Sequence, residues 1–333
     1  MKSMPEKPDP PGLRAYIEAR LEAELADVAS VAPELVELVR RYCRRAGKLI
    51  RPRLLIETAR LYGHLPEGAG ELRDLGPVKE LAAAVELLHL VALVHDDRID
   101  GLDRENRPIA GDHTAASLRV LAGDLVHSLA LDMIGRTRSR HELPEEILSV
   151  VRNASVRTIA GQAQNMRFLA DHGARPSLQA LYELYDGKTG HYSFVVPLRL
   201  GLLASGPEAS ASSDHRILER LGLLLGRIFQ LRDDVADTAE LREAPGDAVP
   251  DWEFNLAATY VAETERGGSV LQEPREPGAG VVALDNMDLE ALSTWTSMRI
   301  AAIREELEET ARQLSLPEER GLALLHYALD LIG

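Results

Sequence analysis

Two aspartate clusters with the same spacing are the residues of this sequence best suited to chemistry. Each reads Asp-Asp-x-x-Asp, and the members are Asp96, Asp97 and Asp100 in the first cluster and Asp233, Asp234 and Asp237 in the second. On a helix, residues i and i+4 lie on one face, so the first and last aspartate of each cluster project together. Carboxylates this close repel one another, and the dipole at a helix C-terminus disfavours them further. The clusters therefore indicate bound cations.

The ligand type indicates which cation is bound. Carboxylates without imidazole or thiolate are hard oxygen ligands, which favour Mg²⁺ or Mn²⁺ over zinc or copper. Magnesium keeps water ligands and takes phosphate oxygens from a substrate, so two facing clusters predict a diphosphate held between them. The metal would then act as a Lewis acid on a leaving group. One such cluster alone would more readily be a solvated helix end, whereas two clusters that follow apolar helices favour the metal site.

The elements that position the clusters are predicted to be helices. Apolar residues recur at three and four positions from Leu13 to Ile332, and strand signals are nearly absent. Glycine, proline and serine interrupt this pattern at intervals that suit about ten to twelve helices. We expect an all-α bundle around a deep central cavity, in which two apolar helices end at the aspartate clusters.

Length and composition predict one globular domain. The chain has 333 residues, of which 45% are hydrophobic, enough for a sizeable core. The proline-rich residues 1–12 predict a disordered leader, and residues 13–333 predict a single domain. Residues 266–280, rich in glycine and proline, predict a mobile loop within that domain.

Charge and cysteine content exclude several classes of protein. A formal net charge of −15 argues against a nucleic-acid partner, which would need clustered lysine and arginine. No run approaches the roughly 18 apolar residues of a membrane span. Cys43 is the only cysteine, so no intramolecular disulfide is possible, and we expect a cytoplasmic protein.

Four further segments carry a family resemblance. They are Ala46 to Pro52 (AGKLIRP), Glu86 to Asp100 (ELLHLVALVHDDRID), Gly187 to Thr189 (GKT) and Phe229 to Asp237 (FQLRDDVAD). In order and spacing they resemble the motifs of the trans-prenyltransferases, also called polyprenyl diphosphate synthases, over nearly the whole chain. The resemblance implies the isoprenoid synthase fold and a Mg²⁺-dependent prenyltransferase.

The resemblance also implies roles for individual residues. Lys48, Arg51 and His89 would bind the diphosphate of isopentenyl diphosphate. The residues themselves agree, because Lys48 and Arg51 would share a helix face at i and i+3, and arginine offers a fork for phosphate oxygens. Asp96, Asp100, Asp233 and Asp237 would hold the metal, and Asp97 and Asp234 would support them. Lys188, Thr189 and Gln230 would hold the allylic diphosphate or steady the developing cation, and Arg104 and Arg107 would contact diphosphate.

The reaction implied is chain elongation, in which an allylic diphosphate ionises and the double bond of isopentenyl diphosphate attacks the cation. Val91 and Ala92, just before the first cluster, are small, which favours a product of about C20 or longer. The family also implies a homodimer, for which residues 111–136 match the contact helices.

Two departures from the family motifs keep other functions open. Residues 104–108 read RENRP where the family has two adjacent arginines, and residues 246–256 lack a lysine that contacts diphosphate. A class I terpene synthase needs only one diphosphate site, and Trp252, Phe254 and Phe229 could enclose its cation. Against this, only 4% of residues are aromatic, and Lys48, Arg51 and His89 persist. A non-catalytic partner subunit is a third possibility, although both clusters are complete.

Overall fold

The computed structural model describes residues 12–44, 47–63, 72–101, 113–170, 177–243, 255–264 and 288–333. Within these ranges every regular element is a helix, which confirms the predicted all-α class. The predicted leader, except for Gly12, and the whole of the predicted loop 266–280 lie outside the described residues.

The chain forms two compact units, each assembled from segments that are distant in the sequence. Unit 1 comprises residues 1–152, 196–218 and 315–333, and unit 2 comprises residues 153–195 and 219–314. The assignment of residues 13–333 to a single domain remains a prediction.

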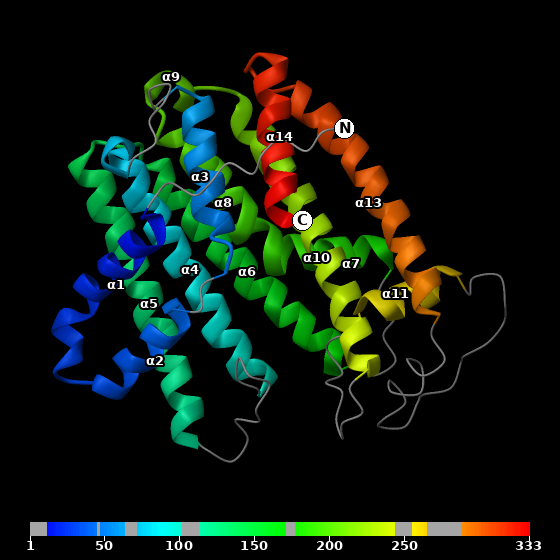
Figure 1. Cartoon of the computed structure of the whole chain (residues 1–333), viewed down its shortest axis with the longest axis horizontal. Helices are drawn as coiled ribbons and strands as arrows, with labels where there is room; N and C mark the ends of the chain where they lie inside the picture. Colours follow the sequence, from blue (N-terminus) through cyan, green and yellow to red (C-terminus); the bar gives the residue numbers. More distant parts are fainter. Residues whose placement is uncertain are drawn as a thin grey trace. The chain divides into compact units, whose positions relative to one another are not determined.

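Unit 1 is built around two long neighbouring helices, α4 (Pro77–Asp100) and α5 (His113–Arg140). Helix α3 (Ile50–Leu61) packs against α4, α8 (Val196–Leu203) and α14 (Glu318–Ile332), so the end of the chain contacts its first third. Figure 1 shows α4 beside α5. The remaining elements of this unit are α1 (Leu13–Ala29), α2 (Pro33–Arg44), a short 3₁₀ helix (Leu72–Leu75) and α9 (Pro207–Ser210).

Local signals set the ends of α4. Gly76 precedes the helix and Pro77 occupies its first turn, where proline removes no intrahelical hydrogen bond. Gly101 ends it with φ 71°, a left-handed conformation that glycine adopts at little cost. The helix therefore ends directly after Asp100, as the sequence predicts.

Unit 2 contains α7 (Leu178–Tyr185), a π-helix (Asp186–Val195), α11 (Asn255–Thr264) and α13 (Leu289–Arg312). Two further helices, α6 (Glu146–Ala170) and α10 (Asp214–Glu243), begin in unit 1 and continue in unit 2. Helix α11 packs against α7 and α13. A π-helix is rare and is found mostly at functional sites, which draws attention to the Gly-Lys-Thr segment that it contains.

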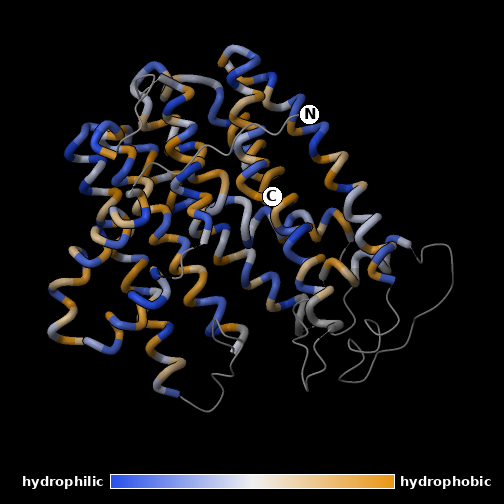
Figure 2. The backbone as a smooth tube through the Cα atoms, viewed as in Figure 1, coloured by the Kyte–Doolittle hydropathy of each residue, from blue (hydrophilic) through white to orange (hydrophobic). Residues whose placement is uncertain are grey.

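Each helix carries both apolar and polar residues along its length, as Figure 2 shows. The apolar positions supply the buried core, for example Leu81, Val85 and Val94 of α4, each at most 1% exposed. None of the described helices combines the length and apolar character that a membrane span requires.

Candidate active site

The first aspartate cluster lies in the last turn of α4. Asp96 and Asp97 are half-buried, and the side chain of Asp100 lies outside the described residues. The buried hydroxyl of Tyr42, from α2, donates a hydrogen bond to Asp97 Oδ2 at 2.5 Å. Burial and this contact with Asp97 raise the pKa of Tyr42 to about 12, although Arg119 of α5 acts in the opposite direction. The phenol therefore stays protonated and fixes one carboxylate of the cluster.

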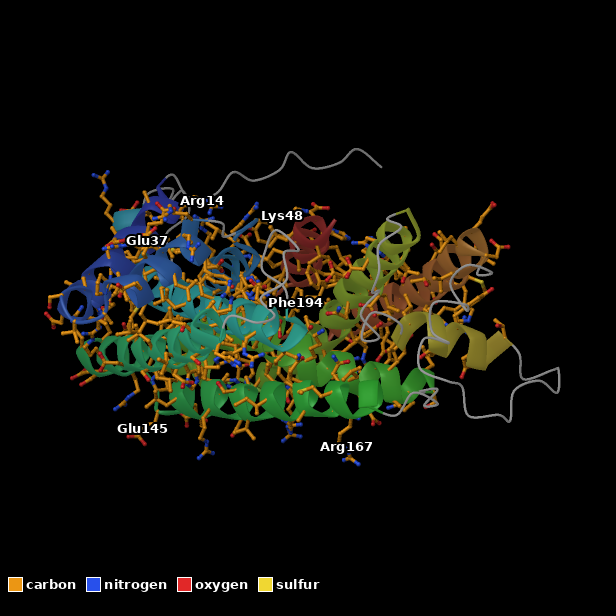
Figure 3. All side chains as sticks on the ribbon, turned by 90° about the horizontal axis from the view of Figure 1, so that it is seen from below. Arg14, Glu37, Lys48, Glu145, Arg167 and Phe194 are labelled. Atoms are coloured by element: carbon orange, nitrogen blue, oxygen red, sulfur yellow. The ribbon has the colours of Figure 1, made fainter. Side chains whose placement is uncertain are left out.

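The Gly-Lys-x-x-Arg segment precedes and enters α3, and one prediction about it is wrong. Lys48 and Arg51 do not share a helix face, because α3 begins only at Ile50 and Lys48 lies in a bend before it. Leu49 between them has a left-handed backbone, with φ 52°, and is buried. The chain therefore turns at Leu49, which leaves Lys48 exposed at the surface of unit 1 and buries Arg51 to 7% exposure (Figure 3).

Two groups near this segment were not found from the sequence. Arg14 Nη2, from α1, donates to the carbonyl of Gly47 at 2.6 Å and so fixes the residue before Lys48. Glu86 of α4 is 1% exposed, and burial raises its pKa, an effect that the charges of Arg51 and Arg14 partly offset. A buried carboxylate thus lies within the electrostatic range of both arginines.

His89, the third residue predicted to bind this diphosphate, is half-buried on α4. It lies one helical turn after Glu86, so both occupy the same face of α4. The predicted diphosphate-binding residues Arg104 and Arg107 lie outside the described residues, as do Trp252, Phe254 and the segment 246–254.

The second aspartate cluster lies within α10, and here a second prediction is wrong. The helix does not end at Asp237 but continues to Glu243, because residues 238–243 contain no helix breaker and proline follows only at position 245. The unfavourable dipole at a helix end therefore bears on the first cluster and not on the second.

A hydrogen-bond network fixes the middle of the second cluster. Thr189 Oγ1 donates to Gln230 Oε1 at 2.8 Å, and Gln230 Nε2 donates to Asp234 Oδ1 at 2.8 Å. The buried hydroxyl of Tyr185 donates to the other oxygen of Asp234. Because the side-chain oxygen of Gln230 accepts the hydrogen bond from Thr189, the side-chain nitrogen of Gln230 is directed to Asp234. The structure thus brings together three of the predicted residues.

Lys188 lies near the two adjacent carboxylates of this cluster. Burial raises the pKa of Asp234, while its hydrogen bonds from Tyr185 and Gln230 and the charge of Lys188 act against the rise. The side chain of Asp233 reaches solvent. The protein around it still raises its pKa by partial burial, and the charge of Lys188 acts against this rise. An ammonium beside carboxylates is suited to a polyanion that binds through both lysine and metal ions.

The π-helix that carries Lys188 is tied to α10 by an ion pair. Arg227 Nε and Nη2 donate to the two oxygens of Asp186, at 2.8 and 2.6 Å. The guanidinium lies 4.9 Å from the centre of the Tyr182 ring. Both charged side chains are mostly buried, with 12% and 16% exposure for Arg227 and Asp186. No local sequence pattern indicates this contact, since 41 residues separate the partners.

The predicted metal ligands fit magnesium by chemistry. All are carboxylates, and the second aspartate of each cluster already accepts a tyrosine hydrogen bond. Asp233 is exposed, and Asp96 and Asp237 are half-buried. Among the described side chains no group of three or more His, Cys, Asp or Glu gathers closely enough to form a complete cage.

The whole fold resembles solved prenyl synthases. The T. brucei farnesyl diphosphate synthase, solved with risedronate, superposes with a TM-score of 0.74 at 20% identity, over 97% of this chain and 98% of that one. This likeness and the helical architecture define the isoprenoid synthase class of fold. Residues 32–262 match the family model Polyprenyl synthetase, and the chain belongs to that family of prenyltransferases, as the motifs predicted.

Sequence relatives agree with this assignment. The octaprenyl diphosphate synthase of Haemophilus influenzae is 25% identical over 92% of this chain and 79% of the relative. A short chain isoprenyl diphosphate synthase of Methanocaldococcus jannaschii is 26% identical over 66% of this chain, and the match spans 62% of that relative's length.

Proposed function

We propose that this protein is a prenyl diphosphate synthase that condenses an allylic diphosphate with isopentenyl diphosphate. The observation that supports this choice is a second set of cationic residues, outside the aspartate clusters, that are predicted to bind phosphate. Lys48, Arg51 and His89 lie on or beside α3 and α4, and α3 and α4 pack together. An enzyme that ionises a single diphosphate would not need them, whereas a condensing enzyme must bind two.

The aspartate clusters are proposed to serve the allylic substrate. Magnesium would be held by Asp96, Asp100, Asp233 and Asp237, where it would neutralise charge on the leaving diphosphate. Lys188 would bind the same diphosphate through its ammonium. The network of Thr189 and Gln230 would present fixed dipoles to the cation that forms when the allylic carbon–oxygen bond breaks. The double bond of isopentenyl diphosphate then forms the new carbon–carbon bond, and a proton passes to the departing diphosphate.

Residues of α4 support a proposal for the product length, and residues of α5 support one for the oligomeric state. Val91 and Ala92 of α4 are half-buried and small, which supports a product of about C20 or longer. The predicted dimer stretch coincides with α5, where Val120 and Leu121 are 43% and 53% exposed. Exposed apolar residues on a helix suit a subunit contact, so we propose a homodimer through α5. We also propose that the protein acts in the cytoplasm.

Product analysis by mass spectrometry tests the function. The pure protein is incubated with Mg²⁺ and dimethylallyl, geranyl, farnesyl or geranylgeranyl diphosphate, each with and without isopentenyl diphosphate. We expect longer diphosphates only when isopentenyl diphosphate is present. A hydrocarbon or alcohol from one allylic diphosphate alone would instead identify a terpene synthase, and no turnover of any pair would favour the non-catalytic subunit.

A pair of variants gives this experiment its control. Asp233→Asn removes a proposed metal ligand, whereas Asp330→Asn changes an exposed aspartate of α14. We expect the first to lose product and the second to match the unchanged protein.

A further inference from the structure

Arg119 is a buried cation without a carboxylate partner among the described residues. Its side chain is only 9% exposed, and its Nη1 donates to the carbonyl of Ala115, one turn earlier on α5, at 3.1 Å. Its Nε has no hydrogen-bond partner among the described residues. No described Asp or Glu lies within ion-pair distance of it, although most other arginines of α5 have one, for example Arg136 with Glu24 at 2.6 Å.

This arginine lies beside the first aspartate cluster. It acts on the hydroxyl of Tyr42 of α2, and that hydroxyl donates to Asp97 of α4 at 2.5 Å. Helices α2, α4 and α5 all contact one another within unit 1. Tyr42 is therefore a shared neighbour of the guanidinium and of Asp97, which places Arg119 close to the cluster.

The burial of this charge has an energetic cost that the described residues do not offset. An arginine taken out of water without a counter-ion loses several kcal/mol of hydration, and replacing such a charge by an apolar side chain is often neutral or stabilising. A charge of this kind is expected where an anion binds during function. The guanidinium fork suits phosphate oxygens in particular.

We propose that Arg119 binds phosphate oxygens of the allylic diphosphate at the first aspartate cluster. The proposal rests on the proposed function and adds a cation that the family motifs do not contain. It also accounts for a local deficit, since residues 104–108 carry Glu105 where the resemblance predicts a second adjacent arginine.

The test separates binding from a purely structural role. Arg119→Met keeps an unbranched apolar stem and removes the guanidinium and its charge. Arg140→Met, at an exposed position of the same helix, is the matched control. Each variant is measured for its unfolding temperature without ligand, its affinity for inorganic diphosphate with Mg²⁺ by calorimetry, and its KM for each substrate.

We expect Arg119→Met to unfold at the same temperature as the unchanged protein or higher, and to bind inorganic diphosphate about 10- to 100-fold more weakly. The KM for the allylic substrate rises, while the KM for isopentenyl diphosphate stays unchanged. A merely structural arginine would give the reverse pattern, with lower stability and unchanged affinity, and that result overturns the proposal.

Two further variants cover other outcomes. Tyr42→Phe tests whether Arg119 acts only through the phenol: if Arg119→Met causes no further loss of affinity in that background, direct binding is excluded. If Arg119→Met does not fold, Arg119→Lys is tested in its place, because lysine keeps the charge without the guanidinium fork. An unchanged affinity of Arg119→Lys for diphosphate would then overturn the proposal. If the unchanged protein makes elongated product and Arg119→Met binds diphosphate normally, only this proposal is refuted. If the unchanged protein does not bind diphosphate at all, the proposed function is refuted as well.

Discussion

The second aspartate of each cluster is held by a tyrosine. Tyr42 donates to Asp97 in unit 1, and Tyr185 donates to Asp234 in unit 2, where Gln230 occupies the other oxygen. A carboxylate that already accepts such hydrogen bonds has fewer lone pairs to offer a metal ion. We therefore propose that the motif Asp-Asp-x-x-Asp contains two kinds of aspartate, the outer ones as metal ligands and the inner one as an anchor.

This difference predicts unequal effects of the same substitution. Asp97→Asn keeps an oxygen that accepts the tyrosine hydroxyl, so we expect kcat to fall by about tenfold or less. Asp234→Asn should cost more than Asp97→Asn, because its new amide nitrogen would face the Nε2 donor of Gln230. Asp96→Asn and Asp233→Asn remove a charged metal ligand, and we expect losses of about 100- to 1000-fold. Steady-state rates at several Mg²⁺ concentrations give the comparison.

Each inner variant has its outer neighbour as a control, since the two differ by one position on the same helix. Equal losses at both positions would show that the inner aspartates also bind metal. A rescue of the outer variants by high Mg²⁺ would support their assignment as ligands.

At this scale the sequence predicted the clusters but not what holds them. The repeated spacing is a local pattern, and it identified Asp96, Asp233 and their neighbours. The two tyrosines are 55 and 49 residues away from their aspartates, so their pairing depends on how distant helices pack. Nothing in local periodicity carries that information.

Among the elements, the π-helix from Asp186 to Val195 is the most unusual, and besides the hydrogen bond from Thr189 to Gln230 two kinds of contact join it to α10. One is the ion pair between Asp186 and Arg227, and the other is a close approach of glycines. A side chain at Gly226 would place its Cβ 2.6 Å from the Cα of Gly190. These contacts determine where Lys188 and Thr189 lie against α10.

Breaking the ion pair from one side should therefore reduce both stability and rate. Asp186→Asn leaves Arg227 mostly buried without a full partner charge, which we expect to cost up to about 3 kcal/mol of unfolding free energy. We expect kcat to fall more than the KM for isopentenyl diphosphate changes. The measurements are urea unfolding and steady-state kinetics.

The exchange of the two charges, Asp186→Arg with Arg227→Asp, is the control. It restores an ion pair, so recovery of stability above that of either single variant would show that pairing matters. No recovery, with single variants as stable as the unchanged protein, would contradict this role.

Gly226→Ala tests the close approach. The added methyl group must push backbone atoms apart, so we expect a loss of about 1–3 kcal/mol of stability and a lower rate. Gly135→Ala is the matched control, because no described atom lies within 4 Å of its new Cβ and α5 is helical there. Alanine should stabilise that position by up to about 1 kcal/mol. Thermal unfolding of both variants shows whether the site or the substitution matters.

Helix boundaries were predictable where a residue stops the helix for local reasons. Pro77 and Gly101 mark α4 in the sequence and in the structure. The extension of α10 to Glu243 and the turn at Leu49 were missed, because a functional motif was assumed to coincide with a helix end or a helix face. The π-helix was missed as well, since its hydrogen bonds depend on packing with α10 rather than on residue type.

At the scale of the whole molecule, acid should destabilise the fold through His191. Burial lowers the pKa of this histidine to about 4, with Arg157 acting in the same direction and Glu219 against it. The unfolded chain binds a proton near the ordinary value of about 6.5, so stability falls as pH drops below it. The loss should approach about 3 kcal/mol at pH 4. Urea unfolding between pH 7 and 4 measures it.

A substitution isolates this histidine from the carboxylates that also titrate in acid. His191→Gln removes the titrating group, so its stability should fall less steeply with pH than that of the unchanged protein. His141→Gln, at an exposed position, should leave the slope unchanged. Identical slopes for all three proteins would contradict the assignment.

The helical class and the family followed from the sequence, because periodicity and motif order extend over the whole chain. The division into two units did not. Unit 1 includes residues 315–333 together with the first half of the chain, and only tertiary packing brings such distant segments together.

The two anchoring phenols have a spectroscopic consequence. The chain contains only 8 tyrosines and 2 tryptophans, so its near-ultraviolet absorbance comes from few groups. A cation that binds the outer aspartates would bring positive charge beside the carboxylate that accepts the phenol, so we expect that hydrogen bond to weaken and the tyrosine band to shift. The shift of a tyrosine absorbance band would therefore report cation binding at each cluster. Tyr42→Phe should abolish the shift from the first cluster and Tyr185→Phe the shift from the second.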